Sequence, residues 1–286
     1  MAHNEAANIG RLLARIRESR LEQVEVAEVW VVASGCTDAT EDIVREAAAA
    51  DPRIRLISQP TREGKASAMN LFIRAAGCDV LVLSSADLLP AEDAIERLVA
   101  PFAGPEIGLT ACRPEPVNDP ATFMGFAAHL LWNLHHQMNL NGFKAGEMIA
   151  FRRVFERIPP HTAVDEASVE PLIRGQGYEV RYVPEAVVYN KGPETVEDFL
   201  RQRRRIYAGH LEMQSRLGYS VSTMSGGKIA VLLLRNLDWR PKQLCWTARV
   251  VALEVYGRYL GRRDYKSRRS HTVWEIATTT KELDTP

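Results

Sequence analysis

Four short stretches of the sequence combine acidic, basic and small polar residues in an order that suits phosphate and metal chemistry. They are Ala2–Glu5, Ser34–Thr40, Arg62–Asn70 and Ser85–Asp87. Lys65 follows Gly64 at an expected helix start, where an anion can meet both the ammonium and free backbone amides. Asp87 follows an apolar stretch, and a carboxylate there can hold a divalent cation that also binds phosphate oxygens. Together they favour a site for a phosphorylated ligand.

Each stretch also has a purely structural explanation. A Lys in the first turn of a helix is usually a solvated charge, and an Asp after a strand is usually a cap or turn residue. Gly35 permits a tight turn, and Thr37 or Asp38 can cap the helix that follows. The functional interpretation therefore depends on the four stretches meeting in space.

An alternation of apolar strands and amphipathic helices would bring the stretches together. Buried strands are expected at residues 27–34, 53–59, 79–85 and 107–113, with helices at 37–50, 63–76 and 91–102. Strands that alternate with helices of about 10–15 residues favour a parallel sheet with helices on both faces. Ligands of such sheets bind at the carboxyl ends of the strands, which is where the four stretches lie.

The composition is typical of a globular protein with a sizeable core. The 286 residues are 46% hydrophobic and 25% charged with a formal net charge of zero, which allows one large domain with appendages or two smaller ones. The four cysteines lie far apart, which argues against a zinc site or a disulfide framework and favours a reducing compartment. The sequence opens on polar residues and has no apolar run of about 20 residues, so we expect a cytoplasmic protein that does not cross the membrane.

The order and spacing of the stretches resemble the family 2 glycosyltransferases, which have the GT-A fold. The family's first strand ends in Pro/Ala-x-Asn-Glu, matched by Ala2–Glu5, and its second ends in a variant of Asp-Asp-Gly-Ser-Thr-Asp-Gly-Thr, matched by residues 33–40. Its Gly-Lys-x-x-Ala-x-Asn element falls on Gly64–Asn70, and its metal-binding Asp-x-Asp falls on residues 85–87. The resemblance spans residues 2–208 and implies an α/β, GT-A-like, mostly parallel sheet flanked by helices.

The resemblance also implies roles for particular residues. Glu166 takes the place of the family's catalytic base, with Asp165 beside it as the alternative, and Asp87 would hold Mg²⁺ or Mn²⁺. Without the other motifs, these two adjacent acids would instead be a cap and a first-turn charge of the next helix. The donor nucleotide sugar would be contacted by residues from all the strand ends and from a later Gln-x-x-Arg-Trp-like element, namely Ala2, His3, Glu5, Ser34, Arg62, Lys65, Ser85, Asp87, Gln202 and Arg205. The stretch Gly146–Arg153 resembles the strand that shapes the acceptor side.

The sequence departs from the family pattern in several places. Ala33 and Ser34 replace an Asp pair, Ser85 replaces the first Asp of the metal motif, and Ile206 replaces a Trp. Asp87 alone remains in that motif, so substrate phosphates and water must complete the coordination and metal binding should be weaker. The apolar residues that normally precede Ala2 are also absent, so either the start of the sequence is assigned late or the sheet tolerates a missing first strand.

The C-terminal region is basic and aromatic. Between Lys228 and Arg269 there are eleven Lys and Arg residues but only three acids. A helix starting at Pro241 carries apolar residues at helical spacing, namely Trp246, Val250, Leu253 and Leu260. Such an amphipathic helix can lie on an anionic lipid surface or pack on the catalytic domain with a solvated basic face. We expect the lipid surface, through residues 228–269.

The aromatic run Phe123–Leu140 predicts a long helix. His135 and His136 within it are expected to be satisfied helical histidines, and the aromatic residues are expected to form core or the wall of an acceptor groove.

We therefore expect an enzyme that transfers a sugar from a nucleotide diphosphate donor to an acceptor hydroxyl. The expected donor is UDP-linked, and the family resemblance implies inversion at the anomeric carbon. The preferred acceptor is a lipid or lipid-linked molecule at the inner face of the membrane, and no nucleic acid partner is expected. The alternative is a catalytically degenerate protein of the same fold that only binds a nucleotide sugar. The expected divisions are a nucleotide-sugar half at 1–115, an acceptor and catalytic half at 116–218, a basic helical extension at 219–270 and a polar tail at 271–286.

Overall fold

The computed structural model describes residues 1–159, 166–218, 226–269, 278–280 and 283, so Asp165 and most of the expected polar tail lie outside the described residues. The helices in chain order are α1 (Ile9–Arg17), α2 (Thr40–Ala50), α3 (Lys65–Ala75), α4 (Ala94–Val99), α5 (Phe123–Leu140), α6 (Val169–Gly175), α7 (Val196–Leu217), α8 (Gly226–Arg235) and α9 (Pro241–Lys266). The strands are β1 (Val29–Ser34), β2 (Ile54–Gln59), β3 (Val80–Leu83), β4 (Leu89–Pro90), β5 (Ile107–Pro116), β6 (Ile149–Arg152) and β7 (Glu179–Asn190). The α/β alternation expected from the sequence is confirmed.

The strands form two sheets, β1-β2 and β3-β6-β5-β7-β4. Strands β1 and β2 are parallel, and so are β5 and β7. Strand β6 lies between β3 and β5 and runs antiparallel to both, so β3 and β5 share one direction. Strand β4 is antiparallel to β7. The larger sheet is therefore mixed, whereas the alternation predicted parallel neighbours. The reason is that β6, which follows α5 in the sequence, lies between β3 and β5, two strands that precede it in the sequence.

Met1 and Ala2 lie between the two sheets. The Ala2 amide donates to the carbonyl oxygen of Val32 at 2.9 Å, and the Ser34 amide donates to that of Ala2 at 2.9 Å. On the other side, the Ala86 amide after β3 donates to the Met1 carbonyl oxygen at 3.0 Å. The two residues thereby connect the carboxyl ends of β1 and β3. This connection places the stretch Ala2–Glu5 beside Ser34–Thr40 and Ser85–Asp87.

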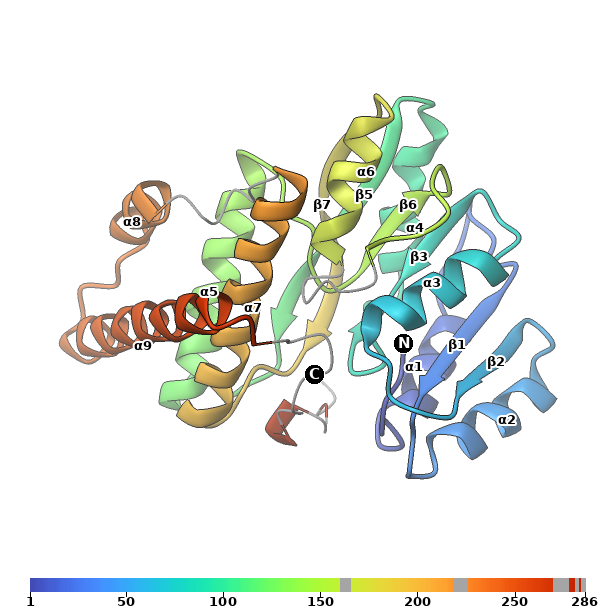
Figure 1. Ribbon diagram of the computed structural model, residues 1–286, viewed down its shortest axis with the longest axis horizontal. Coiled ribbons are helices and arrows are strands. Elements are labelled where there is room, and N and C mark those ends of the chain that lie inside the picture. Colours follow the sequence, from blue (N-terminus) through green and yellow to red (C-terminus); the bar gives the residue numbers. More distant parts are fainter. Residues whose placement is uncertain (160–165, 219–225, 270–277, 281–282, 284–286) are drawn as a thin grey trace.

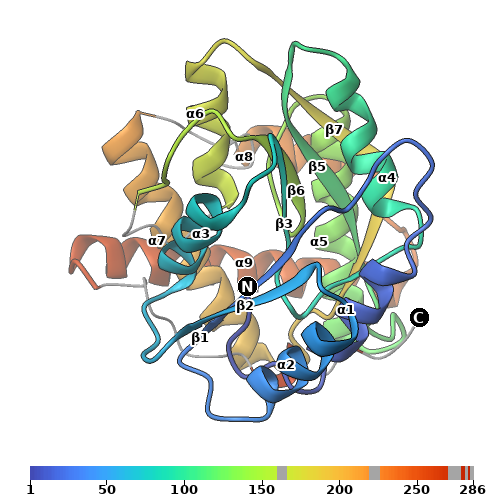
Figure 2. The same cartoon turned by 90° about the vertical axis from the view of Figure 1, so that its right-hand side faces the viewer.

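Apolar packing on both faces holds the larger sheet in place (Figures 1 and 2). Met69 of α3 and Ile173 of α6 pack with Phe151 of β6 in one buried cluster. Leu98 of α4 packs with Ala150, the neighbour of Phe151, in a second cluster, because successive strand residues point to opposite faces. Helices α1 and α2 cover β1 and β2, at the end of the molecule opposite α8 and α9.

Helix α9 packs closely along α7. A Cβ added at Gly257 would lie 2.7 Å from the Arg203 Cβ, and one at Gly261 would lie 2.6 Å from the Arg204 carbonyl oxygen, so both glycines allow the close approach. Arg204 also forms an ion pair with Asp264, which is 3% exposed. These contacts fix α7, the helix that carries the Gln-x-x-Arg-Trp-like element.

The apolar stripe of α9 faces the protein, as in the alternative interpretation of this helix. Val250 is buried, and the Trp246 ring packs edge-on against Phe123 and Phe126 of α5, with centroids 5.9 and 5.5 Å away. The stripe therefore packs on the protein, because an amphipathic pattern does not specify what covers its apolar side, and the expected lipid contact of residues 228–269 stays a prediction. Within the described part of the chain, we find no helix that is both long and apolar enough to span a bilayer.

Candidate active site

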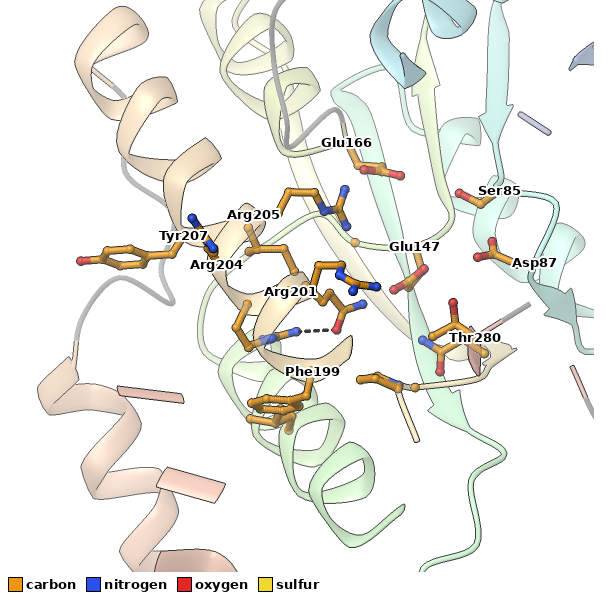
Figure 3. A pocket seen from close by; sticks show the side chains of 18 of the residues that line it. Ser85, Asp87, Glu147, Glu166, Phe199, Arg201, Arg204, Arg205, Tyr207 and Thr280 are labelled. Carbon is orange, nitrogen blue, oxygen red and sulfur yellow. Dashed lines mark hydrogen bonds between the residues drawn. The ribbon is translucent and has the colours of Figure 1, made fainter. Parts of the chain in front are cut away.

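A cleft of about 830 Å³ lies where the strand ends of the sheet face helix α7 (Figure 3). The predicted site residues that line it are Ala2, His3, Glu5, Ser34, Arg62, Lys65, Ser85, Asp87, Glu166, Gln202 and Arg205. Asp165, the remaining predicted site residue, lies outside the described residues. The structure thus brings these distant parts of the chain together, while the role of each residue stays a prediction.

Lys65 and Glu166 form an ion pair in the cleft, and their side chains are only 16% and 17% exposed. The Lys65 ammonium also donates to the Ser85 hydroxyl at 2.7 Å. Burial acts to raise the pKa of Glu166, but the charge and hydrogen bond of Lys65 outweigh it, with help from Arg205, and hold that pKa below its usual value. Glu166 is therefore a carboxylate at neutral pH.

Lys65 reaches this position because α3 begins at the cleft. Gly64, which precedes the helix, has a φ of 91°, a backbone conformation that favours glycine. Gly35, after β1, also has a positive φ of 60°, and a Cβ there would lie 2.6 Å from the Arg62 amide nitrogen. Both turns therefore need glycine, and they set the entry to α3 against the end of β1.

Hydrogen bonds link the stretch Ala2–Glu5 to the turn after β1. The His3 Nδ1 lies 2.6 Å from the Ser34 carbonyl oxygen, and the Thr37 amide donates to Asn4 Oδ1 at 2.8 Å. Asp38 accepts from the backbone amide of Thr40, the first residue of α2, at 3.0 Å, although the N-cap position itself is Ala39 and makes no side-chain cap hydrogen bond. Glu5 is buried, and its carboxylate accepts from the side-chain amide of Asn8 at 2.9 Å. These contacts make the stretch a rigid edge of the cleft.

Glu147 lines the cleft although it was not among the predicted site residues. It follows Gly146 just before β6, has a φ of 46°, and faces the same space as Asp87 and Glu166 (Figure 3). Burial raises the pKa of Glu147 to about 7, and the nearby carboxylates of Asp87 and Glu166 add to the effect. The sequence offered one signal, an acid at the entry to a buried strand, but nothing local indicated that it points into the site.

The consecutive arginines of α7 point in different directions. Arg204 pairs with Asp264 of α9, and Arg203 lies 3.8 Å from Glu254 of the same helix. Arg205 lines the cleft close enough to Glu166 to lower its pKa. Arg205 is therefore the arginine of this run whose charge acts on the predicted base, while its contact with the donor stays a prediction.

The histidines of α5 have the structural partners that the sequence predicted. The side-chain amide of Asn139 donates to the backbone carbonyl oxygen of His135 at 3.0 Å, and the same nitrogen lies 3.2 Å from Nδ1 of the His135 ring. His136 Nδ1 lies 2.8 Å from the Tyr182 hydroxyl. These contacts confirm the interpretation of both as satisfied helical histidines.

The family of the chain follows from its sequence profile. Residues 1–159 match glycosyl transferase family 2, and residues 172–260 match glycosyl transferase family group 2. The chain belongs to glycosyl transferase family 2. It is thus a glycosyltransferase whose family match covers both the strand-end motifs and β6.

Solved structures have the same GT-A fold as this family 2 glycosyltransferase. The mannosyltransferase PcManGT from Pyrobaculum calidifontis, in complex with GDP-Man and Mn²⁺, is 24% identical, with 99% of this chain and 85% of that chain covered and a TM-score of 0.60. Glucosyl-3-phosphoglycerate synthase from Mycobacterium tuberculosis, in complex with Mn²⁺ and UDP-Glc, is 22% identical, with 77% and 78% covered and a TM-score of 0.54. No curated protein is similar enough to count as a match.

The glycosyltransferase cleft suits a divalent cation only in part. Within the described ranges, no group of three or more His, Cys, Asp or Glu residues could hold a metal ion. Asp87 and Glu147 nevertheless supply carboxylate oxygens on two sides of one space (Figure 3), and such oxygens are the ligands that Mg²⁺ and Mn²⁺ prefer. Burial, together with the charges of Asp87 and Glu166, raises the pKa of Glu147, and a cation bound beside Glu147 would favour its carboxylate form. The residues therefore fit a cation whose coordination is completed by a substrate.

Proposed function

We propose that this glycosyltransferase moves a sugar from a nucleoside diphosphate donor to an acceptor hydroxyl, with inversion at the anomeric carbon. The nucleotide that we propose for the donor is UDP. The observation that carries the proposal is the convergence of Lys65, Asp87 and Glu166 in one cleft. A cationic side chain at a helix start and an acid at a strand end suit a diphosphate, and the third residue is a carboxylate that can accept a proton.

The donor diphosphate would lie between the start of α3 and Asp87. Lys65 would bind its phosphate oxygens, and Arg205 can add a bidentate contact from α7. Asp87, with Glu147 as a second carboxylate, would hold Mg²⁺ or Mn²⁺, which when bound supplies charge neutralisation on the leaving diphosphate. The Ser85 hydroxyl, which now accepts from Lys65, would remain as a neutral neighbour in the position where the family has an acid.

Glu166 would act as the base. It would take the proton of the acceptor hydroxyl as that oxygen attacks the anomeric carbon and the bond between this carbon and the diphosphate oxygen breaks. In the structure Glu166 is paired with Lys65, which weakens it as a base. Donor phosphates would compete for Lys65 and so free the carboxylate, which ties activation of the base to arrival of the donor.

Lys65→Met is expected to weaken UDP binding about 10- to 100-fold, because a hydrogen bond to a charged group contributes about 1.5–3 kcal/mol. Isothermal titration of the purified chain with UDP and Mn²⁺ measures the affinity. Lys242→Met is the matched control, since Lys242 is an exposed lysine of α9. Equal UDP affinity for Lys65→Met and the wild type would remove Lys65 from the donor site.

We also propose that α8 and α9 rest on an anionic lipid surface, which would bring a lipid or lipid-linked acceptor to the cleft. Helix α8 has no buried residue, and large apolar side chains stand exposed on α8, on α9 and between them, namely Val231, Leu234, Trp239, Val255, Tyr256 and Tyr259. The segment Lys228–Arg269 carries an excess of basic residues, which complements anionic headgroups. These side chains lie outside the stripe of α9 that packs on α5 and α7.

Flotation with phosphatidylglycerol vesicles tests this surface. We expect the wild-type chain to float with these vesicles but not with phosphatidylcholine vesicles, and the double variant Leu234→Ser with Trp239→Ser to lose most of the binding, because apolar burial and charge attraction act together. The matched control is Leu140→Ser, which changes an exposed leucine at the end of α5 in the same way. Equal flotation of the double variant and the wild type would contradict the proposal.

A catalytically degenerate binding protein is the second candidate, favoured by Ala33, Ser34 and Ser85, where the family has acids. It predicts that UDP binds with normal affinity and that no donor sugar is released from any nucleotide sugar that stabilises the fold. A screen of nucleotide sugars by thermal stabilisation, followed by donor turnover, separates the two candidates.

A further inference from the structure

We call one part of the cleft the inner lobe. Side chains of α5, α7 and α9, and Lys144 between α5 and β6, line this part, namely His135, Lys144, Arg203, His210, Glu254 and Arg258. Glu147 joins the two parts, since its charge acts on Lys144 as well as on the carboxylates near Lys65. None of the inner-lobe residues was predicted to contact the donor.

His210 is the most unusual member of the inner lobe. Its side chain lines the cleft, the residue is only 6% exposed, and neither ring nitrogen has a hydrogen-bond partner in the described structure. A buried imidazole with both nitrogens unsatisfied is costly, and such a group calls for a bound partner. The Arg203 Nε is likewise buried without a hydrogen-bond partner among the described residues.

The charges of the inner lobe favour an anion. Three cationic side chains, Lys144, Arg203 and Arg258, surround one carboxylate, Glu254. Glu254 is bonded to Arg258 at 2.9 Å and lies 3.8 Å from Arg203, so it holds these two arginines in place. Burial lowers the pKa of Lys144 to about 8, and the charges of Arg203 and Arg258 add to the effect. The three cationic side chains outnumber the one carboxylate among the lining residues of the lobe.

We propose that the inner lobe binds a phosphate group of the acceptor substrate, with Lys144, Arg203 and His210 as its ligands. This inference rests on the proposed function, since it names the class of acceptor for the same cleft. Phosphate suits the set because it accepts several hydrogen bonds at once and its charge matches two or more cations. An uncharged sugar acceptor would leave the excess charge of the lobe unmatched.

The phosphate could belong to a lipid or to a small molecule. Leu131 and Trp132 line the cleft one turn before His135 on α5, and Ile229 of α8 also lines it, so an alkyl chain would find apolar contacts. The acceptor hydroxyl must reach Glu166, which lines the same cleft as the inner-lobe residues. Either source would present the same phosphate oxygens to Lys144 and His210.

Titration of the full chain, saturated with UDP and Mn²⁺, with glycerol 3-phosphate and separately with decyl phosphate below its micelle concentration tests the proposal. We expect at least one probe to bind at one site, and Lys144→Met and His210→Leu each to weaken that binding about tenfold or more, because each removes a hydrogen bond to a charged group. Lys266→Met, at the exposed end of α9, should bind the probes like the wild type. Tighter binding of decyl phosphate assigns the phosphate to a lipid, and tighter binding of glycerol 3-phosphate assigns it to a small molecule.

UDP affinity serves as the folding control for the variants, and His210→Asn is the milder second variant if His210→Leu fails that control. Failure of both probes to bind to the UDP-saturated wild type would overturn the inner-lobe proposal, as would unchanged phosphate affinity in variants that bind UDP normally. Failure of the wild type to bind UDP at all would instead overturn the proposed function.

Discussion

Glu166→Gln is expected to lower the turnover number for sugar transfer by about 10²–10⁴-fold, the usual contribution of a general base, while donor binding persists. Glutamine keeps the size of the side chain but cannot take the proton of the acceptor hydroxyl. The ion pair with Lys65 disappears, so Lys65 should stay available to the donor phosphates. Release of nucleoside diphosphate from the nucleotide sugar that stabilises the fold most, in the presence of acceptor, measures the turnover.

The control for this variant is Glu185→Gln, which changes an exposed acid of β7 in the same way. Its turnover should match that of the wild type. Wild-type turnover in Glu166→Gln would exclude Glu166 as the base and would direct attention to Asp165, the alternative that the sequence left open.

The N-terminal part of the fold, residues 1–115, could be predicted because its signals are local. Apolar runs, a glycine at a turn and a polar residue at a helix start fixed α2, α3 and the strands before them to within a few residues. The meeting of Lys65, Asp87 and Glu166 in one cleft followed from the general rule that ligands of α/β sheets bind at strand ends. Gly35 and Gly64 were informative because both turns require a positive φ.

Other features could not be predicted because they depend on contacts between distant parts of the chain. Strand β6 has the composition of any buried strand, and only its neighbours β3 and β5 determine that it runs antiparallel. Glu147 stands at the entry to that strand, and its approach to Asp87 depends on where β6 inserts (Figure 3). The three consecutive arginines of α7, Arg203–Arg205, are equivalent in sequence, but Asp264 and Glu254 of α9 engage two of them.

Asp87→Asn is expected to remove most of the gain in UDP affinity that Mn²⁺ provides. Asparagine keeps the shape of the side chain and one oxygen but loses the negative charge, and Ser85 offers no second acid in the motif. A metal ion contributes several kcal/mol of charge stabilisation to such sites, so the loss should be on the order of 100-fold at about 1.4 kcal/mol per tenfold change. Glu147 alone would then face the cation, with the substrate phosphates.

The measurement that tests the central claim most directly is a titration of the wild type, Asp87→Asn and Asp79→Asn with UDP, each with and without Mn²⁺. Asp79→Asn is the matched control because Asp79 is exposed at the opposite end of β3 from Asp87. The account predicts that Mn²⁺ tightens UDP binding to the wild type and to Asp79→Asn but has little effect on Asp87→Asn. Equal enhancement by Mn²⁺ in all three proteins would contradict a cation-bridged diphosphate at this cleft.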